Sequence, residues 1–188
     1  MIAEAEELLE FWLGEVGPDG WYGGGEALDA TCRTRFLATW ERARTGALDL
    51  WSCAPRSALA LTVLLDQLPR NMFRNDPRAF ATDAQARSLV KTAIPRGFDL
   101  RIPEPERQFF YMPLEHSESI ADQARAVRLF LLRVSDREFL LHARAHRAVI
   151  RRFGRFPYRN AALGRRSTAA ETAFLDAGGY AAAVADVG

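Results

Sequence analysis

Cysteine is scarce in this chain of 188 residues, and the two cysteines, Cys32 and Cys53, do not have the C-x-x-C or another metal-site spacing. We therefore expect two free thiols in a reducing compartment, both inert because they lie on or beside apolar stripes. The opening MIAEAEELLEFW is acidic and lacks the basic stretch and the long apolar run of a signal peptide. These features predict a cytoplasmic protein.

No apolar run is long enough to cross a bilayer, which takes about 20 residues. The most apolar stretch is 58–65, where every residue except Thr62 is hydrophobic. A helix that is apolar on all sides is buried in a core, because a surface helix keeps a polar face. We therefore expect a buried central helix near 55–67 and no membrane as a partner.

Strand-like alternation with hairpin turns is also absent. Apolar residues recur instead at helical spacing, first over 2–13 with a stop at Gly14, then over 28–43 with a stop at Gly46. The hydrophobic content of 48% and the charged content of 26% are those of an ordinary globular protein. We predict an all-α fold, with residues 1–188 forming a single domain of seven or eight helices.

Capping signals mark several of the expected helix starts. Ser117 or Ser119 is expected to cap the helix that carries Ile120. Three further pairs fit the capping-box pattern: Thr82 with Gln85, Ser135 with Glu138, and Thr168 with Glu171. The Ser135 pair predicts a long helix that ends near Phe153.

Charges of one sign are missing from two segments. Residues 1–32 hold eight acids without a Lys or Arg, and residues 139–170 hold eight arginines without an acid. The formal net charge of only +1 gives no bulk attraction to nucleic acid or to membranes. We expect several acids of 4–29 to face arginines of 144–166. The alternative is an exposed basic face for phosphate or nucleic acid.

Recognised catalytic and metal motifs are missing as well. The sequence has no G-x-S-x-G elbow, and its glycine-rich stretch 14–25 follows a helix and lacks a G-K-[ST] ending. We interpret that stretch as a connection with an exposed Trp21–Tyr22 pair. His142 and His146 share one helical face as zinc ligands do, but His146 falls on an apolar stripe, which is typical of a hydrogen-bonded core histidine. We predict neither a metal nor a cofactor.

The polar end of the central helix carries the strongest functional signal. Asp66 lies where the helix dipole disfavours negative charge, so Arg70 or Arg74 is expected to offset it. The sequence Leu-Pro-Arg-Asn at 68–71 predicts a turn, and Phe-Pro-Tyr-Arg-Asn at 156–160 predicts a second one. We expect the two turns to meet in space. They would form either a structural clasp or a pocket for an anionic group, and both readings stay open.

Several motifs together resemble the bacterial domain-of-unknown-function family 924. They are EFWLGE (10–15), LLDQLPRNMFR (64–74), AFATD (79–83), ERQFFYMPLEHSE (106–118) and HRAVIRRFGRFPYRNAALGRRST (146–168). The resemblance implies an all-α fold similar to the tetratricopeptide-like superfamily, and it implies no activity. The 34-residue tetratricopeptide signature itself is not visible. Tyr158 departs from the family pattern, in which this position often holds histidine.

Three classes of function remain open from the sequence. The first is a scaffold that binds a small anionic molecule or a peptide. The second is an enzyme that uses Asp66, Glu115 or His116 beside the arginines. The third and least favoured is an arginine-rich nucleic-acid binder. The candidate ligand-binding residues are Asp66, Arg70, Asn71, Arg74, Glu115, His116, Arg155, Arg159 and Asn160.

Overall fold

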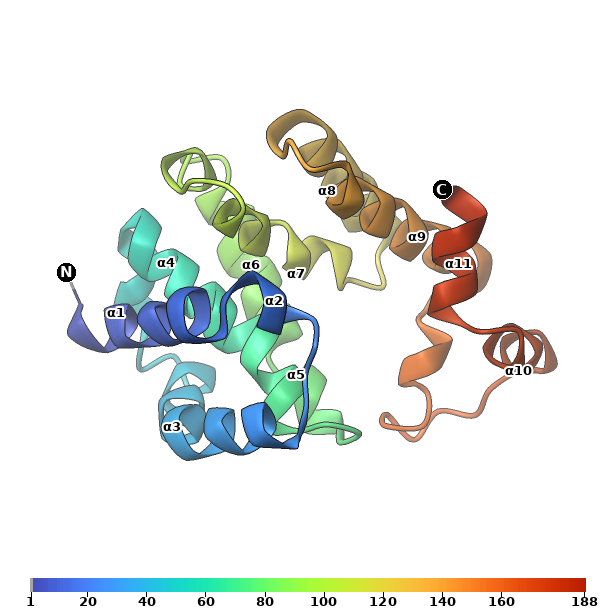
Figure 1. Cartoon of the computed structure of the whole chain (residues 1–188), viewed down its shortest axis with the longest axis horizontal. Coiled ribbons are helices and arrows are strands. Elements are labelled where there is room, and N and C mark those ends of the chain that lie inside the picture. Colours follow the sequence, from blue (N-terminus) through green and yellow to red (C-terminus); the bar gives the residue numbers. More distant parts are fainter. Residues whose placement is uncertain (1) are drawn as a thin grey trace. The chain divides into compact units, whose positions relative to one another are not determined.

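The computed structural model describes residues 2–188, and this range contains helices without a single strand. The chain divides into two compact units, residues 1–110 and residues 111–188, which are described separately below. The predicted all-α fold is confirmed (Figure 1). Within the described range no helix is both long and apolar enough to cross a membrane.

The first unit is built from six α-helices, two π-helical segments and four 3₁₀ turns. The α-helices are α1 (Ala3–Leu9), α2 (Gly17–Trp21), α3 (Glu26–Arg44), α4 (Pro55–Thr62), α5 (Leu68–Met72) and α6 (Asp83–Ala93). The π-helical segments are η1 (Glu10–Val16) and η3 (Val63–Gln67). The 3₁₀ turns are η2 (Asp49–Cys53), η4 (Pro77–Phe80), η5 (Asp99–Arg101) and η6 (Glu106–Phe110).

The predicted buried central helix is confirmed as α4 and its continuation η3. Every residue from 57 to 69 is buried, and Leu59 and Leu64 are fully enclosed. α4 packs against α1, α6 and η2, so its sides are covered by other elements of the same unit. The all-round apolar sequence has the buried position that its composition requires.

The end of the central helix differs from the expectation. Residues 68–71 were predicted as a turn, but they belong to α5, and Pro69 lies in its first turn. Proline lacks an N–H and cannot bond the carbonyl four residues earlier, which belongs to Leu65. The Thr82 hydroxyl donates to that carbonyl at 2.6 Å and accepts a hydrogen bond from Trp40 Nε1 at 3.1 Å. This tertiary contact supplies the bond that Pro69 cannot make.

The first helix also runs further than predicted. Gly14 does not end it, because the backbone continues through η1 to Val16 and then into α2. Trp21 was expected to be exposed but is buried, and its Nε1 donates to the Trp12 carbonyl at 2.7 Å. Tyr22, its neighbour, is 57% exposed. Only the tyrosine of the predicted exposed pair therefore faces solvent.

The second unit contains five α-helices and one 3₁₀ turn. They are α7 (Met112–Glu115), α8 (Ile120–Arg133), α9 (Arg137–Phe153), η7 (Pro157–Arg159), α10 (Ala169–Asp176) and α11 (Tyr180–Val187). The long helix predicted to end near Phe153 is confirmed as α9, which lies between α8 and α11 (Figure 1). Apolar side chains of α9, α10 and α11 form one core together with Phe156.

The capping predictions have mixed outcomes. The capping box of Thr168 and Glu171 is present at α10. Thr82 occupies the N-cap position of α6, but its hydroxyl bonds elsewhere and does not cap the helix. The N-cap of α9 is Asp136, whose carboxylate accepts from the backbone N–H two residues on, so the predicted cap by Ser135 is wrong.

The two cysteines are free thiols in different surroundings. Cys32 is buried on α3, and burial is the main reason that the pKa of its thiol rises to about 12. The thiol therefore stays protonated and unreactive at neutral pH, as predicted. Cys53 is exposed, so the expectation of a core position is wrong for it.

Candidate functional site

Asp66 and Arg70 meet acids and amides of the first unit. Asp66 is fully buried, and its Oδ2 accepts a hydrogen bond from Gln67 Nε2 at 2.5 Å. Arg70 NH2 lies 3.9 Å from Asp66 Oδ1 and 2.8 Å from Asp83 Oδ1. Arg70 NH1 also donates to the Ala79 carbonyl. The guanidinium therefore joins the end of the central helix to the start of α6, a structural clasp.

Asn71 and Arg74 hold a second acid of the same unit. Arg74 donates to both carboxylate oxygens of Asp29 on α3, at 2.7 and 2.9 Å, and Asn71 Nδ2 donates to Oδ1 at 3.0 Å. The hydrogen bonds from Arg74 are the main reason that the pKa of Asp29 is lowered. Asp29 is therefore ionised at neutral pH and ties α3 to α5.

The acids near the N-terminus also have partners in the first unit. The pairs are Glu4 with Arg42 at 2.7 Å, Glu6 with Arg56 at 2.6 Å, and Glu15 with Arg35 at 2.8 Å. These acids and Asp29 thus have arginine partners in the first unit, and that acids of 4–29 face arginines of 144–166 stays a prediction of the sequence. Exposed pairs of this kind contribute little each, about 0–1 kcal/mol.

Arg155 has its partner within the second unit. Its Nε lies 2.6 Å from Glu171 Oε1, and its NH2 lies 2.8 Å from Oε2. The same NH2 donates to the Arg166 carbonyl at 2.9 Å. The Arg155 hydrogen bonds and the Thr168 backbone N–H lower the pKa of Glu171 to about 2. Arg155 thus fixes the loop before α10 through the glutamate of its capping box.

Asn160 and Arg159 also lie in a network local to their own loop. Asn160 Nδ2 donates to Ser167 Oγ at 3.0 Å, and its Oδ1 accepts from Arg165 Nε at 2.9 Å. Arg165 in turn donates to both carboxylate oxygens of Glu118, at 2.8 and 3.0 Å. The buried Arg159 places its guanidinium carbon 4.4 Å from the centre of the Phe156 ring.

The two segments expected to meet, residues 68–71 and 156–160, lie in different units. The arginine and asparagine side chains described above contact groups of their own unit. Arg70, Arg74 and Arg155 are all bonded to carboxylates, which favours the clasp interpretation over an open anion pocket at these three residues. That the two segments meet in one cluster stays a prediction of the sequence.

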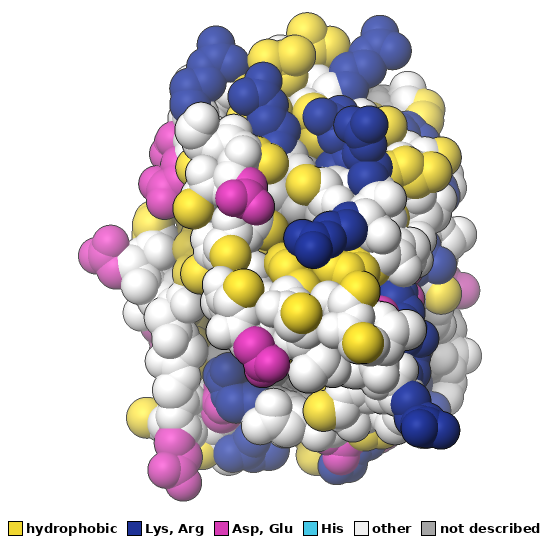
Figure 2. Space-filling view, turned by 90° about the vertical axis from the view of Figure 1, so that its right-hand side faces the viewer, with side chains coloured by type: hydrophobic (Ala, Val, Ile, Leu, Met, Phe, Trp, Pro, Cys, Tyr) yellow, Lys and Arg dark blue, Asp and Glu magenta, His cyan; other side chains and the backbone are white. Residues whose placement is uncertain are grey.

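Other arginines of the second unit are more open to solvent. Its sequence carries twelve arginines and eight acids, and the face in Figure 2 shows Lys and Arg side chains interspersed with Asp and Glu and with apolar and uncharged ones. On α9, Arg144 and Arg151 are exposed, and no ion pair is seen for either within residues 2–188. That this basic face binds nucleic acid stays a prediction.

All three histidines of the sequence gather in the second unit. We define the histidine–tyrosine cluster as Glu115, His116, His142, His146, Tyr158 and Tyr180. The His146 ring centre lies 4.6 Å from that of Tyr180 and 6.1 Å from that of His116. Tyr180 also bonds His142 Nδ1 through its hydroxyl at 2.7 Å. Of the predicted candidate residues, the cluster contains Glu115 and His116.

The centre of the cluster is a chain of three polar groups. His146 Nε2 lies 3.3 Å from Glu115 Oε1, and His146 Nδ1 lies 3.1 Å from the Tyr158 hydroxyl. A carboxylate facing Nε2 favours the tautomer with hydrogen on that nitrogen, which leaves Nδ1 to accept the phenolic proton. Each group therefore donates to the next: the Tyr158 O–H donates to His146 Nδ1, and His146 Nε2–H faces the Glu115 carboxylate.

Helix ends bring these groups together. Glu115 is the last residue of α7, His146 lies in the middle of α9, and Tyr158 lies in η7. Gly154, with a φ of +70°, ends α9 in the left-handed region and reverses the chain. Tyr158 then stacks on Phe156, whose ring centre is 5.4 Å from that of His146. The reversal at Gly154 brings the hydroxyl back to a histidine twelve residues earlier.

Burial sets the protonation of the cluster. It is the largest cause that lowers the pKa of His146 well below 6.5, and the positive charges of His116, Arg159 and His142 act in the same direction. The Glu115 carboxylate favours the imidazolium, but the net shift is downward. Burial likewise raises the pKa of Tyr180, followed by the effects of Glu115 and Tyr158. His146 is therefore a neutral imidazole at pH 7, able to accept a proton.

The lowered pKa of His146 predicts a dependence of stability on pH. Below about pH 6.5 His146 takes up a proton in the unfolded chain but stays neutral in the folded chain. The free energy of unfolding should therefore decrease as the pH is lowered, by up to about 1.4 kcal/mol per pH unit. Urea unfolding between pH 7.5 and 5.5 measures this slope. His146→Gln should reduce it, whereas His142→Gln, one turn away and 39% exposed in its side chain, should change it little. Equal slopes in wild type and His146→Gln would contradict the assignment.

Sequence reasoning found only part of this site. The position of His146 on an apolar stripe predicted a hydrogen-bonded core histidine, and this is confirmed. Tyr158 was noted for departing from the family pattern, but nothing in the sequence linked it to His146. Within residues 2–188, the His, Cys, Asp and Glu side chains do not form a group of three or more placed to hold a metal.

The fold and the site define an all-α protein with two helical units and, in the second, a His–Tyr–Glu centre whose tyrosine is exposed. Residues 8–179 match the family of bacterial proteins of unknown function DUF924, so the chain belongs to that family. A similar solved structure is that of the protein of unknown function ATU0120 from Agrobacterium tumefaciens. It is 41% identical, with a TM-score of 0.87 over 93% of this chain and 97% of that one. No curated protein matches the chain.

Proposed function

We propose that this chain is an acid–base enzyme whose reacting group is the Tyr158 hydroxyl. The observation that carries the proposal is the chain Tyr158–His146–Glu115, with separations of 3.1 and 3.3 Å. It follows the general arrangement in which a nucleophile or acid meets a base that a third group orients. The carboxyl Glu115, expected from the sequence as a catalytic candidate, acts here as the orienting group.

The gradient of exposure along the chain supports this assignment. Glu115 is 5% exposed and the His146 side chain 14% exposed, whereas Tyr158 is 37% exposed. Tyr158 is therefore the member of the chain most open to a substrate in solvent, while the base and its carboxylate stay shielded from water. Shielding strengthens the electrostatic coupling between them.

The chemistry of such a chain is proton transfer. The neutral imidazole takes the phenolic proton at Nδ1 as the Tyr158 oxygen accepts a proton from the substrate, and both proton movements reverse when that oxygen returns a proton to the product. Glu115 stabilises the imidazolium that forms in between. The lowered pKa of His146 keeps the imidazole unprotonated and available at neutral pH.

Selective labelling of tyrosine tests the proposal. An arylsulfonyl fluoride forms an oxygen–sulfur bond with an activated phenol, the sulfur–fluorine bond breaks, and the phenolic proton passes to the base. We expect Tyr158 to be labelled at least about tenfold faster than Tyr22, as measured by peptide mass spectrometry, because general bases accelerate such steps strongly. Tyr22 is the comparison because it is more exposed, at 57%, so exposure alone would favour its labelling. Its hydroxyl donates to the amide oxygen of Gln108, which is not a base.

Two variants separate activation from exposure. His146→Gln keeps a polar side chain but loses the base, so the rate at Tyr158 should fall to that of an ordinary tyrosine while the rate at Tyr22 stays unchanged. His142→Gln alters the neighbouring Tyr180 pair and should leave the rate at Tyr158 nearly the same. Faster labelling of Tyr22 than of Tyr158 in the wild type, or no effect of His146→Gln, would rule the proposal out.

A further inference from the structure

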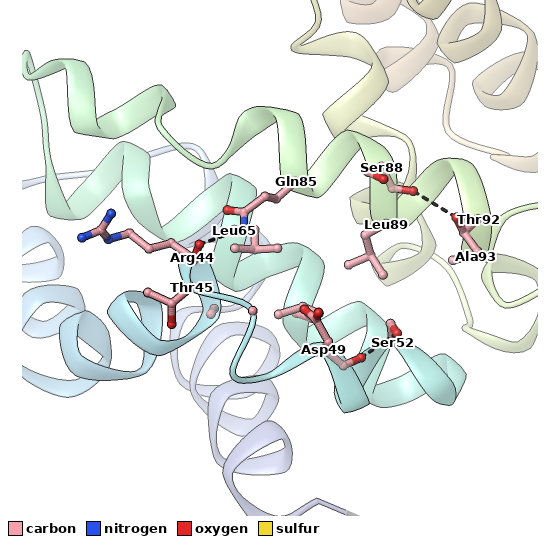
Figure 3. Close-up of a pocket in the computed structure, with 13 residues that line it drawn as sticks. Arg44, Thr45, Asp49, Ser52, Leu65, Gln85, Ser88, Leu89, Thr92 and Ala93 are labelled. Carbon is pink, nitrogen blue, oxygen red and sulfur yellow. Dashed lines mark hydrogen bonds between the residues drawn. The ribbon is translucent and has the colours of Figure 1, made fainter.

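A cavity of about 460 Å³ lies in the first unit, and its lining includes no residue of the histidine–tyrosine cluster. It is open to solvent and is bordered by the end of α3, η2, the central helix with η3, and α6 (Figure 3). Its volume falls within the range of about 300–1,000 Å³ that is usual for small-molecule sites. None of the candidate residues predicted from the sequence lines it, although Leu65 precedes Asp66 directly.

Most hydrogen-bond donors on the cavity wall are already used. The hydroxyls of Thr45, Ser52 and Thr92 each donate to a backbone carbonyl three or four residues earlier, at 2.9, 2.6 and 3.2 Å. Gln85 Nε2 donates to the Arg44 carbonyl at 3.0 Å. The cavity therefore has few groups left with which to bind an acceptor.

The one arginine of the wall has its charge compensated elsewhere. Arg44 Nε lies 2.5 Å from Glu41 Oε2, and its guanidinium carbon lies 5.7 Å from the centre of the Trp40 ring. Figure 3 shows the guanidinium pointing away from Asp49 and Leu89. Arg44 thus contributes its backbone and its stem to the wall, while its charge lies outside.

Acceptors, in contrast, remain available. Asp49 lines the cavity at its solvent-exposed side, and within residues 2–188 no hydrogen bond or ion pair is seen for its carboxylate. Gln85 turns its Nε2 to Arg44, which leaves its amide oxygen as an acceptor. Leu61, Leu65 and Leu89 supply an apolar surface beside these groups. The wall therefore combines a negative charge, spare acceptors and an apolar floor.

We propose that this cavity binds a small primary amine with an apolar body. The ammonium donates to the Asp49 carboxylate and to the Gln85 amide oxygen, and the apolar body packs on the three leucines. A charged hydrogen bond to a carboxylate is about twice as strong as a neutral one, so the positive charge decides selectivity. The site lies in the first unit and does not depend on the proposed role of Tyr158.

Binding of 2-phenylethylamine, compared with 2-phenylethanol, tests the proposal. The two probes have the same shape, but only the amine carries a positive charge. In NMR titrations of the full chain we expect the amine to shift the amides of Ser88 and Leu89 and to bind about tenfold or more tightly than the alcohol. Asp49→Asn should remove this preference, because the variant keeps the size of the side chain and loses the charge.

Two further variants serve as controls. Asp19→Asn removes an exposed carboxylate of the first unit outside the cavity and should leave amine binding unchanged. Ser88→Phe places an aromatic ring into the cavity from an exposed position of α6 and should weaken binding of both probes. Equal affinity for amine and alcohol, no effect of Asp49→Asn, or no shifts at the cavity wall would each overturn the proposal.

Discussion

Replacing Arg70 with alanine is expected to lower the free energy of unfolding by about 3–5 kcal/mol, the range found when one partner of a buried ion pair is removed. Arg70 lies between Asp66, which is fully buried, and Asp83, whose side chain is 11% exposed. It also donates to the Ala79 carbonyl. Alanine would remove a positive neighbour of two carboxylates, one of which is fully buried. Urea unfolding followed by circular dichroism measures the loss.

Arg78→Ala is the matched control for this prediction. Arg78 also bonds an aspartate through two nitrogens, at 3.0 and 2.9 Å from Asp76, but the Arg78 side chain is 62% exposed and that of Asp76 34% exposed. Water can replace that pair, so the urea midpoint of Arg78→Ala should stay close to that of the wild type. A similar loss in the two variants would show that burial does not set the contribution of Arg70.

The pocket interpretation makes the opposite prediction. If Arg70 held a site for an anion, Arg70→Ala would unfold almost as the wild type does. A phosphate or carboxylate ligand at about 100 times its Kd would then stabilise the wild type by about 2.7 kcal/mol. If Arg70→Ala has nearly wild-type stability and the ligand stabilises the wild type in this way, the pocket interpretation is correct and the clasp interpretation is wrong.

Local composition predicted the fold where one residue type dominated a segment. The stretch 58–65 is apolar on all sides and is buried, and the stripe through α3 ends at Gly46 as expected. The predicted secondary structure was wrong where a residue distant in sequence supplied a hydrogen bond to the backbone. Pro69 continues a helix because Thr82 bonds the carbonyl that proline leaves, and no local pattern contains that contact.

The candidate site shows the same division. The sequence predicted that Arg70 or Arg74 would offset Asp66, and the structure places Arg70 3.9 Å from it. The stronger partner of Arg70 is Asp83, and Tyr158 reaches His146 only after the chain reverses at Gly154. Such pairs depend on how helices pack, so the sequence supplied the residue types and the structure supplied the pairing.

Thr82→Val is expected to lower the free energy of unfolding by about 2–4 kcal/mol. Valine has nearly the shape of threonine but lacks the hydroxyl that donates to the Leu65 carbonyl at 2.6 Å and accepts from Trp40 Nε1 at 3.1 Å. Thr82 is 1% exposed and Trp40 2%, so water cannot easily replace either bond. Each buried polar group left without a partner costs about 1–3 kcal/mol.

Thr92→Val on the same helix separates this effect from the general cost of replacing threonine. The Thr92 hydroxyl also bonds a backbone carbonyl, that of Ser88 at 3.2 Å, but Thr92 is exposed and water can take its place. Its variant should stay within about 0.5 kcal/mol of the wild type. Thermal unfolding should therefore show a melting temperature lower by roughly 5–15 °C for Thr82→Val alone. Equal shifts in the two variants would mean that α5 does not depend on the hydroxyl of Thr82 to continue past Pro69.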